Sequence, residues 1–160
     1  MCDAGVPAVP NLYWFRREDL DRYGAWLADT GPAAVAINLQ TFRRDASWND
    51  MALPGLAYLS LLLPAHTRLI ATGTSRRDRI AQLHALFGDR LVLVSQNPQQ
   101  YARHGAVMTA SGRVDVHAHD HDAFAASVRF YAGLLDQPAP DWRLDEDAGL
   151  VVVGEEGACS

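Results

Sequence analysis

The chain contains no lysine, and all fourteen of its basic residues are arginines. Without lysine it cannot form a Schiff base with a substrate, attach pyridoxal phosphate or supply the lysine of a P-loop. Cysteine is also scarce: Cys2 and Cys159 stand near the two ends of the sequence. Chain ends are commonly frayed, so we expect neither cysteine to form a structural disulfide or to ligate a metal.

Long apolar runs are missing as well, since the longest, residues 56–63, is too short to span a bilayer. The first residues lack the basic and then apolar pattern of a signal peptide. We therefore expect a soluble, cytoplasmic protein with no membrane partner. The net charge of −5 argues against duplex nucleic acid as a partner, because polyanion binders usually carry an excess of basic residues.

The 160 residues fit one domain. Apolar strand-like stretches at residues 11–15, 33–39, 68–72 and 91–95 alternate with segments of helical periodicity as far as His104. This order predicts an α/β fold: a single three-layer domain with a mainly parallel sheet of four to five strands. A half-barrel-like β/α arrangement is the alternative, because four strand-helix units fit either form.

Past Gly105 the rhythm changes. Residues 106–108 and 114–116 predict a small hairpin or an edge addition to the sheet. A helix carrying Phe124, Val128, Tyr131 and Leu135 follows, then a linker at 137–141 and a last strand at 150–153. We assign residues 1–153 to the single domain and residues 154–160 to a flexible tail.

Three arginine pairs, each followed at once by an acid, come directly after expected strands. The pairs are Arg16-Arg17, Arg43-Arg44 and Arg76-Arg77. Loops that leave the carboxyl ends of parallel strands share one edge of the sheet, where ligands of such folds bind. The planar guanidinium suits carboxylate and phosphate, so the pairs predict an arginine-rich rim that binds an anion. The acids after the pairs also favour a helix start, and they could pair with the arginines as solvated salt bridges.

Neutral polar residues extend this predicted edge. Small residues and hydroxyls after the third strand let backbone amides approach an anion, and amides elsewhere could orient a sugar, a base or a carboxamide. The additional candidates are Asn38, Gln40, Gly73, Thr74, Ser75, Ser95, Gln96 and Asn97. Neither GxxxxGK[ST] nor GxGxxG occurs, so the sequence identifies no cofactor.

A histidine tract, Asp115-Val-His117-Ala-His119-Asp120-His121-Asp122, provides the other candidate site. In a strand His117, His119 and His121 would share one face, and imidazoles at this spacing are recurrent metal ligands. The tract is one residue shorter than the HxHxDH motif of metallo-β-lactamase-like hydrolases. The competing interpretation is a strand end with Asp120 or Asp122 capping the next helix, and we expect no stoichiometric metal there.

The sequence therefore predicts binding of a small anionic metabolite, including phosphorylated ones, at the carboxyl edge of a parallel sheet, with or without turnover. A metal-dependent hydrolase built on the histidine tract is one alternative. A non-catalytic interaction module, whose arginines are merely solvated, is another. No catalytic residue, substrate or oligomeric state is indicated.

Overall fold

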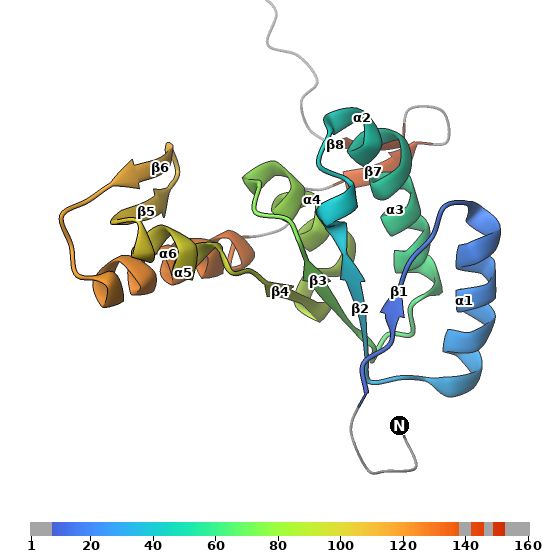
Figure 1. Cartoon of the computed structure of the whole chain (residues 1–160). Helices are drawn as coiled ribbons and strands as arrows, with labels where there is room; N and C mark the ends of the chain where they lie inside the picture. The colour runs from blue at the N-terminus through green and yellow to red at the C-terminus, as the bar shows by residue number, and fades with distance from the viewer. Residues whose placement is uncertain (1–7, 138–141, 146–148, 153–160) are drawn as a thin grey trace, which may run out of the picture.

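The computed structural model describes residues 8–137, 142–145 and 149–152 (Figure 1). Strands and helices alternate from the start of this range to α5, and two antiparallel hairpins and a long helix follow. In chain order the strands and α-helices are β1 (Asn11–Leu12), α1 (Arg17–Thr30), β2 (Ala34–Asn38), α2 (Asp45–Ser47), α3 (Leu53–Leu62), β3 (Arg68–Thr72), α4 (Arg77–Phe87), β4 (Leu91–Val94), α5 (Asn97–Arg103), β5 (Ala106–Thr109), β6 (Gly112–Asp115), α6 (Asp120–Leu135), β7 (Trp142–Asp145) and β8 (Gly149–Val152). Short 3₁₀ turns form η2 (Leu39–Thr41) and η4 (Gly88–Arg90), and η3 (Trp48–Ala52) is a π-helical turn.

Strands β1 to β4 form one parallel sheet in the order β1-β2-β3-β4. The predicted α/β class and parallel sheet are confirmed. Strand β1 ends at Leu12, three residues earlier than expected. The backbone N–H groups of Phe15 and Arg16 donate to Asp19 in the first turn of α1, at 3.0 and 3.3 Å, so the chain has already left the sheet there.

The helices α1, α3 and α4 share one core with one face of the sheet. Leu27, Leu56 and Leu83 from the helices and Ile37 and Leu69 from the strands are each no more than 1% exposed and belong to one cluster. Right-handed crossovers between strands that follow the sequence order bring every connecting helix to the same face. A helix on each face needs a reversal in strand order, and β1 to β4 contain none.

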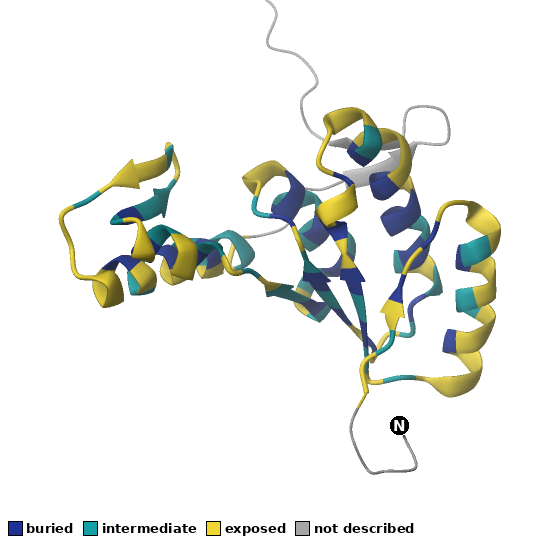
Figure 2. Cartoon of the chain, in the orientation of Figure 1, coloured by how far each residue is buried: buried dark blue, intermediate teal, exposed yellow. Residues whose placement is uncertain are grey.

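The opposite face of the sheet is partly open. Ala36, Ile70 and Val92 are in register across it and are intermediate in exposure (Figure 2). The strands follow the sequence order without a reversal, an order that the half-barrel-like alternative shares.

The segment after β4 forms a smaller unit in which α5, the β5-β6 hairpin and α6 pack together (Figure 1). The predicted hairpin is confirmed, with Val107 opposite Val114. The buried stripe of α6 consists of Ala123, Ser127 and Tyr131. The three buried residues are four positions apart and share one face of the helix. Phe124 and Val128 each follow a buried residue by one position, so they point away from that face and are about two fifths exposed.

A second hairpin, β7-β8, closes the described part of the chain. The strand expected at 150–153 corresponds to β8, whereas β7 was not predicted. Most of the expected linker at 137–141 and all of the expected tail at 154–160 lie outside the described residues. Within the described ranges, no helix is both long and apolar enough to cross a membrane.

Candidate functional site

The loops after the four parallel strands meet at one edge of the sheet and carry the predicted ligand-binding residues. Asn38 ends β2, Gln40 lies in η2, and Arg43 and Arg44 precede α2. The segment 73–76 connects β3 to α4, and 95–96 connects β4 to α5. These residues therefore lie at the carboxyl edge of the sheet, as the sequence predicts. The contacts of their side chains show which of them lie together.

Asp45 joins two of the three arginine pairs. Its Oδ1 accepts hydrogen bonds from Arg76 Nη1 at 2.5 Å and from Arg79 Nη2 at 2.9 Å. Arg76 also donates twice to Asp78, from Nε at 3.1 Å and from Nη2 at 2.6 Å. This ion-pair network holds the loop after β2 against the start of α4, so the pairs Arg43-Arg44 and Arg76-Arg77 lie on neighbouring loops.

Arg79 is the buried centre of this connection, with only 4% of its surface exposed. Its guanidinium donates to the backbone carbonyls of Phe42 at 2.7 Å and Arg43 at 3.1 Å. It also lies over the ring of Trp48, 4.5 Å from the centroid. Sequence reasoning missed Arg79; the signal was its place beside Ile80 and one turn before Leu83, on the face of α4 that packs into the core.

The ion pairs leave a surplus of positive charge at the rim. Five arginines, at positions 43, 44, 76, 77 and 79, stand against Asp45 and Asp78, which leaves three formal positive charges. Among the described residues, no carboxylate pairs with Arg43, Arg44 or Arg77, and all three are exposed. Their guanidinium groups are therefore available to an anion from solvent.

Gly73, Asn38 and Gln40 lie where the loops after β2 and β3 approach each other. Gly73 has φ +82°, and a Cβ there would lie 2.6 Å from the backbone N of Gln40 and 2.7 Å from Asn38 Oδ1. Asn38 Oδ1 already accepts from Gln40 N at 3.0 Å and so caps η2. The close approach of the two loops explains the glycine, and the next residue, Thr74, is buried.

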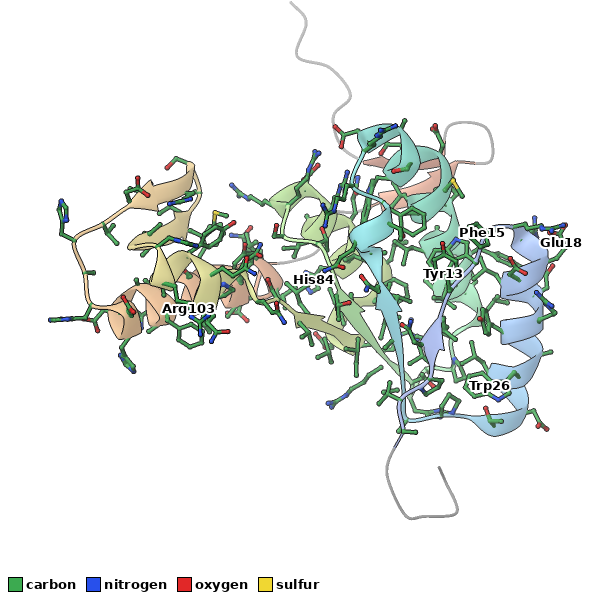
Figure 3. All side chains as sticks on the ribbon, in the orientation of Figure 1. Tyr13, Phe15, Glu18, Trp26, His84 and Arg103 are labelled. Carbon is green, nitrogen blue, oxygen red and sulfur yellow. The ribbon has the colours of Figure 1, made fainter. Side chains whose placement is uncertain are left out.

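The third arginine pair lies elsewhere. Arg17 stands over the ring of Tyr58 in α3, 4.5 Å from its centroid. The start of α1, marked by Phe15 and Glu18 in Figure 3, is at the opposite end of the sheet edge from the start of α4. The structure therefore does not bring Arg16 and Arg17 together with the other two pairs.

A cluster of uncharged polar groups occupies the edge between β3 and β4. Ser75 after β3 and Asn97 and Tyr101 of α5 are neighbours of Tyr131 of α6. Burial raises the pKa of Tyr131 above its ordinary value, and the neighbouring Asn97 and Ser75 oppose that rise. Ser95 Oγ accepts from the Asn97 N–H at 3.2 Å, whereas Gln96 is exposed. Sequence reasoning named Ser75 and Asn97 but not the two tyrosines.

The histidine tract does not form the strand that suggested a metal site. β6 ends at Asp115, and α6 begins at Asp120 with His119 as its N-cap residue. Neither Asp120 nor Asp122 caps the helix, because both lie inside its first turn. In the part of the chain that the structure describes, no three His, Cys, Asp or Glu side chains gather as metal ligands.

A groove of about 500 Å³ lies away from the arginine rim, between β1 and α1. Tyr13 and Trp26 line it (Figure 3), together with the ion pair of Asp19 and Arg22. It contains none of the predicted ligand-binding residues. The groove is open to solvent, and the two charged residues that line it, Asp19 and Arg22, form an ion pair with no net charge.

We expect Asp78 to make the stability of the protein depend on acid pH. The hydrogen bond from Arg76 lowers the pKa of Asp78 in the folded state. A lowered folded-state pKa gives stability that is present above the unfolded value, about 4, and is lost as the pH falls through the folded value. The difference in Tm between wild type and Asp78→Asn should therefore shrink between pH 7 and pH 3 at low salt. A difference that stays constant over this range would contradict the assignment.

Comparisons with known proteins give no family assignment. The chain matches no family model, no curated protein and no solved structure. The charges and contacts at the sheet edge remain as the indication of function. These groups can hold an anion between two loops and can offer hydrogen bonds to an uncharged polar group beside it.

Proposed function

We propose that the protein binds a small anionic metabolite, with or without turnover, at the loops after β2 and β3. The observation that carries this proposal is the bridge from Asp45 to Arg76 and Arg79. It keeps two arginine pairs side by side while leaving Arg43, Arg44 and Arg77 without a described carboxylate partner. Guanidinium groups from two loops match the several oxygens of a phosphate or carboxylate.

The charge balance favours a small anion over a polymer. The whole chain carries a net charge of −5, so its remaining surface repels an extended polyanion. Three arginines without a carboxylate partner among the described residues are enough for one phosphate group. Because the bridging aspartates are largely exposed, with side chains 66% and 55% accessible, the ion pairs serve to position the loops more than to stabilise the fold.

Inorganic phosphate tests the proposal directly. We expect isothermal titration at constant ionic strength to show phosphate binding that weakens at least about tenfold in an Arg43→Gln, Arg77→Gln variant, which corresponds to about 1.4 kcal/mol. Both residues are exposed and lie outside the Asp45 ion pairs, so the substitutions should leave the fold intact.

The matched control is Arg103→Gln, Arg129→Gln, which changes the net charge equally. Both control arginines are exposed, and they lie in α5 and α6, where Figure 3 labels Arg103. This variant should bind phosphate like the wild type. Equal losses in both variants would show non-specific attraction and would favour the interaction-module alternative; no binding by the wild type would refute the proposal.

A further inference from the structure

The outer edge of β1 presents backbone groups to the groove between β1 and α1. Within the described ranges β1 pairs with β2 alone, at one end of the parallel sheet. Successive residues of a strand direct their backbone N–H and C=O groups to opposite sides. Pro10 O accepts from Ala36 N at 2.8 Å, so Pro10 and Leu12 face β2, and the backbone of Asn11 between them faces outwards. This edge can therefore pair with one more strand.

The groove of about 500 Å³ follows this edge, and its other wall is one face of α1. Asp19, Arg22, Tyr23 and Trp26 form that face, because they are three or four positions apart. They span about 10 Å along the helix, which is the length of about three residues of an extended strand. Trp26 and Tyr13, which Figure 3 labels, are 36% and 42% exposed. The groove thus offers aromatic surface and backbone hydrogen bonds over the length of a short strand.

Charge and shape indicate what the groove holds. Asp19 and Arg22 neutralise each other, so a charged side chain placed there would lose hydration without gaining a partner. On the side of β1, α1 is the outermost element of the molecule (Figure 1). A second copy that paired its own β1 about a twofold axis would bring its α1 to the same place, although packed helix axes stay about 8 to 10 Å apart. A single segment with no helix beside it meets no such obstacle.

We propose that the groove binds an uncharged extended segment of a partner protein, which adds to the sheet beside β1 and places apolar side chains against Tyr23 and Trp26. Strand addition of this kind takes its affinity from backbone hydrogen bonds and its specificity from side chains at alternate positions. The site is separate from the arginine rim, none of whose residues line the groove. Peptide binding is therefore independent of the anion.

The probe is the blocked pentapeptide acetyl-Thr-Val-Thr-Val-Thr-amide. Its β-branched residues favour an extended chain, and its two valines share one side. We expect NMR titration of isotopically labelled protein to give a Kd below about 1 mM, with the largest shifts at the residues that line the groove. Two isomers test the binding mode: one is N-methylated at both valines, the other at the third and fifth residues. Because alternate amides face opposite sides of a strand, one isomer should bind like the parent and the other at least about tenfold more weakly.

Two protein variants test the place of binding. Trp26→Ala removes part of the aromatic wall and should weaken peptide binding at least about fivefold. Phe124→Ala is the matched control, since Phe124 is also an exposed aromatic residue of a helix, α6, and it should bind like the wild type. The proposal is overturned if the pentapeptide does not bind, if the two isomers bind equally, or if both variants lose the same affinity. A wild-type dimer that Trp26→Ala dissociates would assign the edge to a second copy and would overturn it too.

Discussion

Replacing Arg79 by methionine should lower the free energy of unfolding by about 3 kcal/mol, because the change leaves buried acceptors without donors. The carbonyls of Phe42 and Arg43 would both lose the guanidinium that now satisfies them. The ring of Trp48 would lose its cationic neighbour as well. Methionine restores much of the volume, so the expected loss comes from hydrogen bonding more than from a cavity.

Urea denaturation measures this loss, and two further variants define its cause. Arg79→Lys keeps the charge but cannot donate to two carbonyls and Asp45 at once, so it should recover only part of the stability. Arg76→Met removes exposed ion pairs, which solvent screens, and should destabilise far less. Equal effects at positions 76 and 79 would show that the carbonyl hydrogen bonds contribute little.

The same substitution connects the fold to the proposed site. Without Arg79 only the exposed Arg76–Asp45 ion pair still holds the loop of Phe42 to Asp45 against α4, so the two arginine pairs lose part of their alignment. We therefore expect Arg79→Met to weaken phosphate binding although Arg79, being buried, does not reach the ligand. Binding at wild-type affinity in a folded Arg79→Met protein would mean that the exposed arginines need no such support.

Local patterns were sufficient to predict most of the fold. The apolar run before Asn38 corresponds to β2, and the spacing of Leu20 and Leu27 corresponds to α1. Such patterns are reliable because the apolar positions of a segment indicate which of its faces is buried. Gly31, at φ 50°, ends α1 in the left-handed conformation that glycine adopts readily. The strand order, and with it the face of the sheet that the helices cover, could not be predicted. Both depend on the side of the sheet to which each new strand is added, and no local pattern shows this.

The candidate site depended on pairings that no local pattern encodes. Asp45 was expected beside the arginines that precede it, yet it binds Arg76 and Arg79, which are 31 and 34 positions away. Only the folded chain shows which of several acids reaches which arginine. Of the polar residues around Tyr131, the sequence identified Ser75 and Asn97 but neither tyrosine, since the four residues come from three separate segments.

The histidine tract shows the opposite case, in which a local pattern offered an alternative that the fold does not adopt. Alternation of histidine with small residues favoured a strand through His121, but β6 ends at Asp115, where its partner strand β5 begins at Ala106. A strand continues only while a neighbour supplies backbone hydrogen bonds. Without that extension, His119 and His121 belong to the start of α6 and have no common face with His117.

Gly55→Ala should destabilise the protein by about 2 kcal/mol, although alanine is the better helix former by about 1 kcal/mol. Gly55 lies in α3, and a Cβ there would come within 2.2 Å of Trp14 Nε1 and 2.6 Å of Cε2. Trp14 is 5% exposed and stacks on Phe42, so the indole cannot move aside without disturbing the core. Overpacking therefore outweighs helix propensity at this position.

Gly133→Ala is the matched control for this prediction. Gly133 also lies in a helix, α6, but a Cβ there would meet no atom within 4 Å. Helix propensity alone then acts, and we expect stabilisation of about 0.5 to 1 kcal/mol. Urea denaturation of the two variants should give changes of opposite sign. If both substitutions stabilise the protein, Trp14 can move aside. The packing of α3 against Trp14 is then looser than the stacking of Trp14 on Phe42 implies.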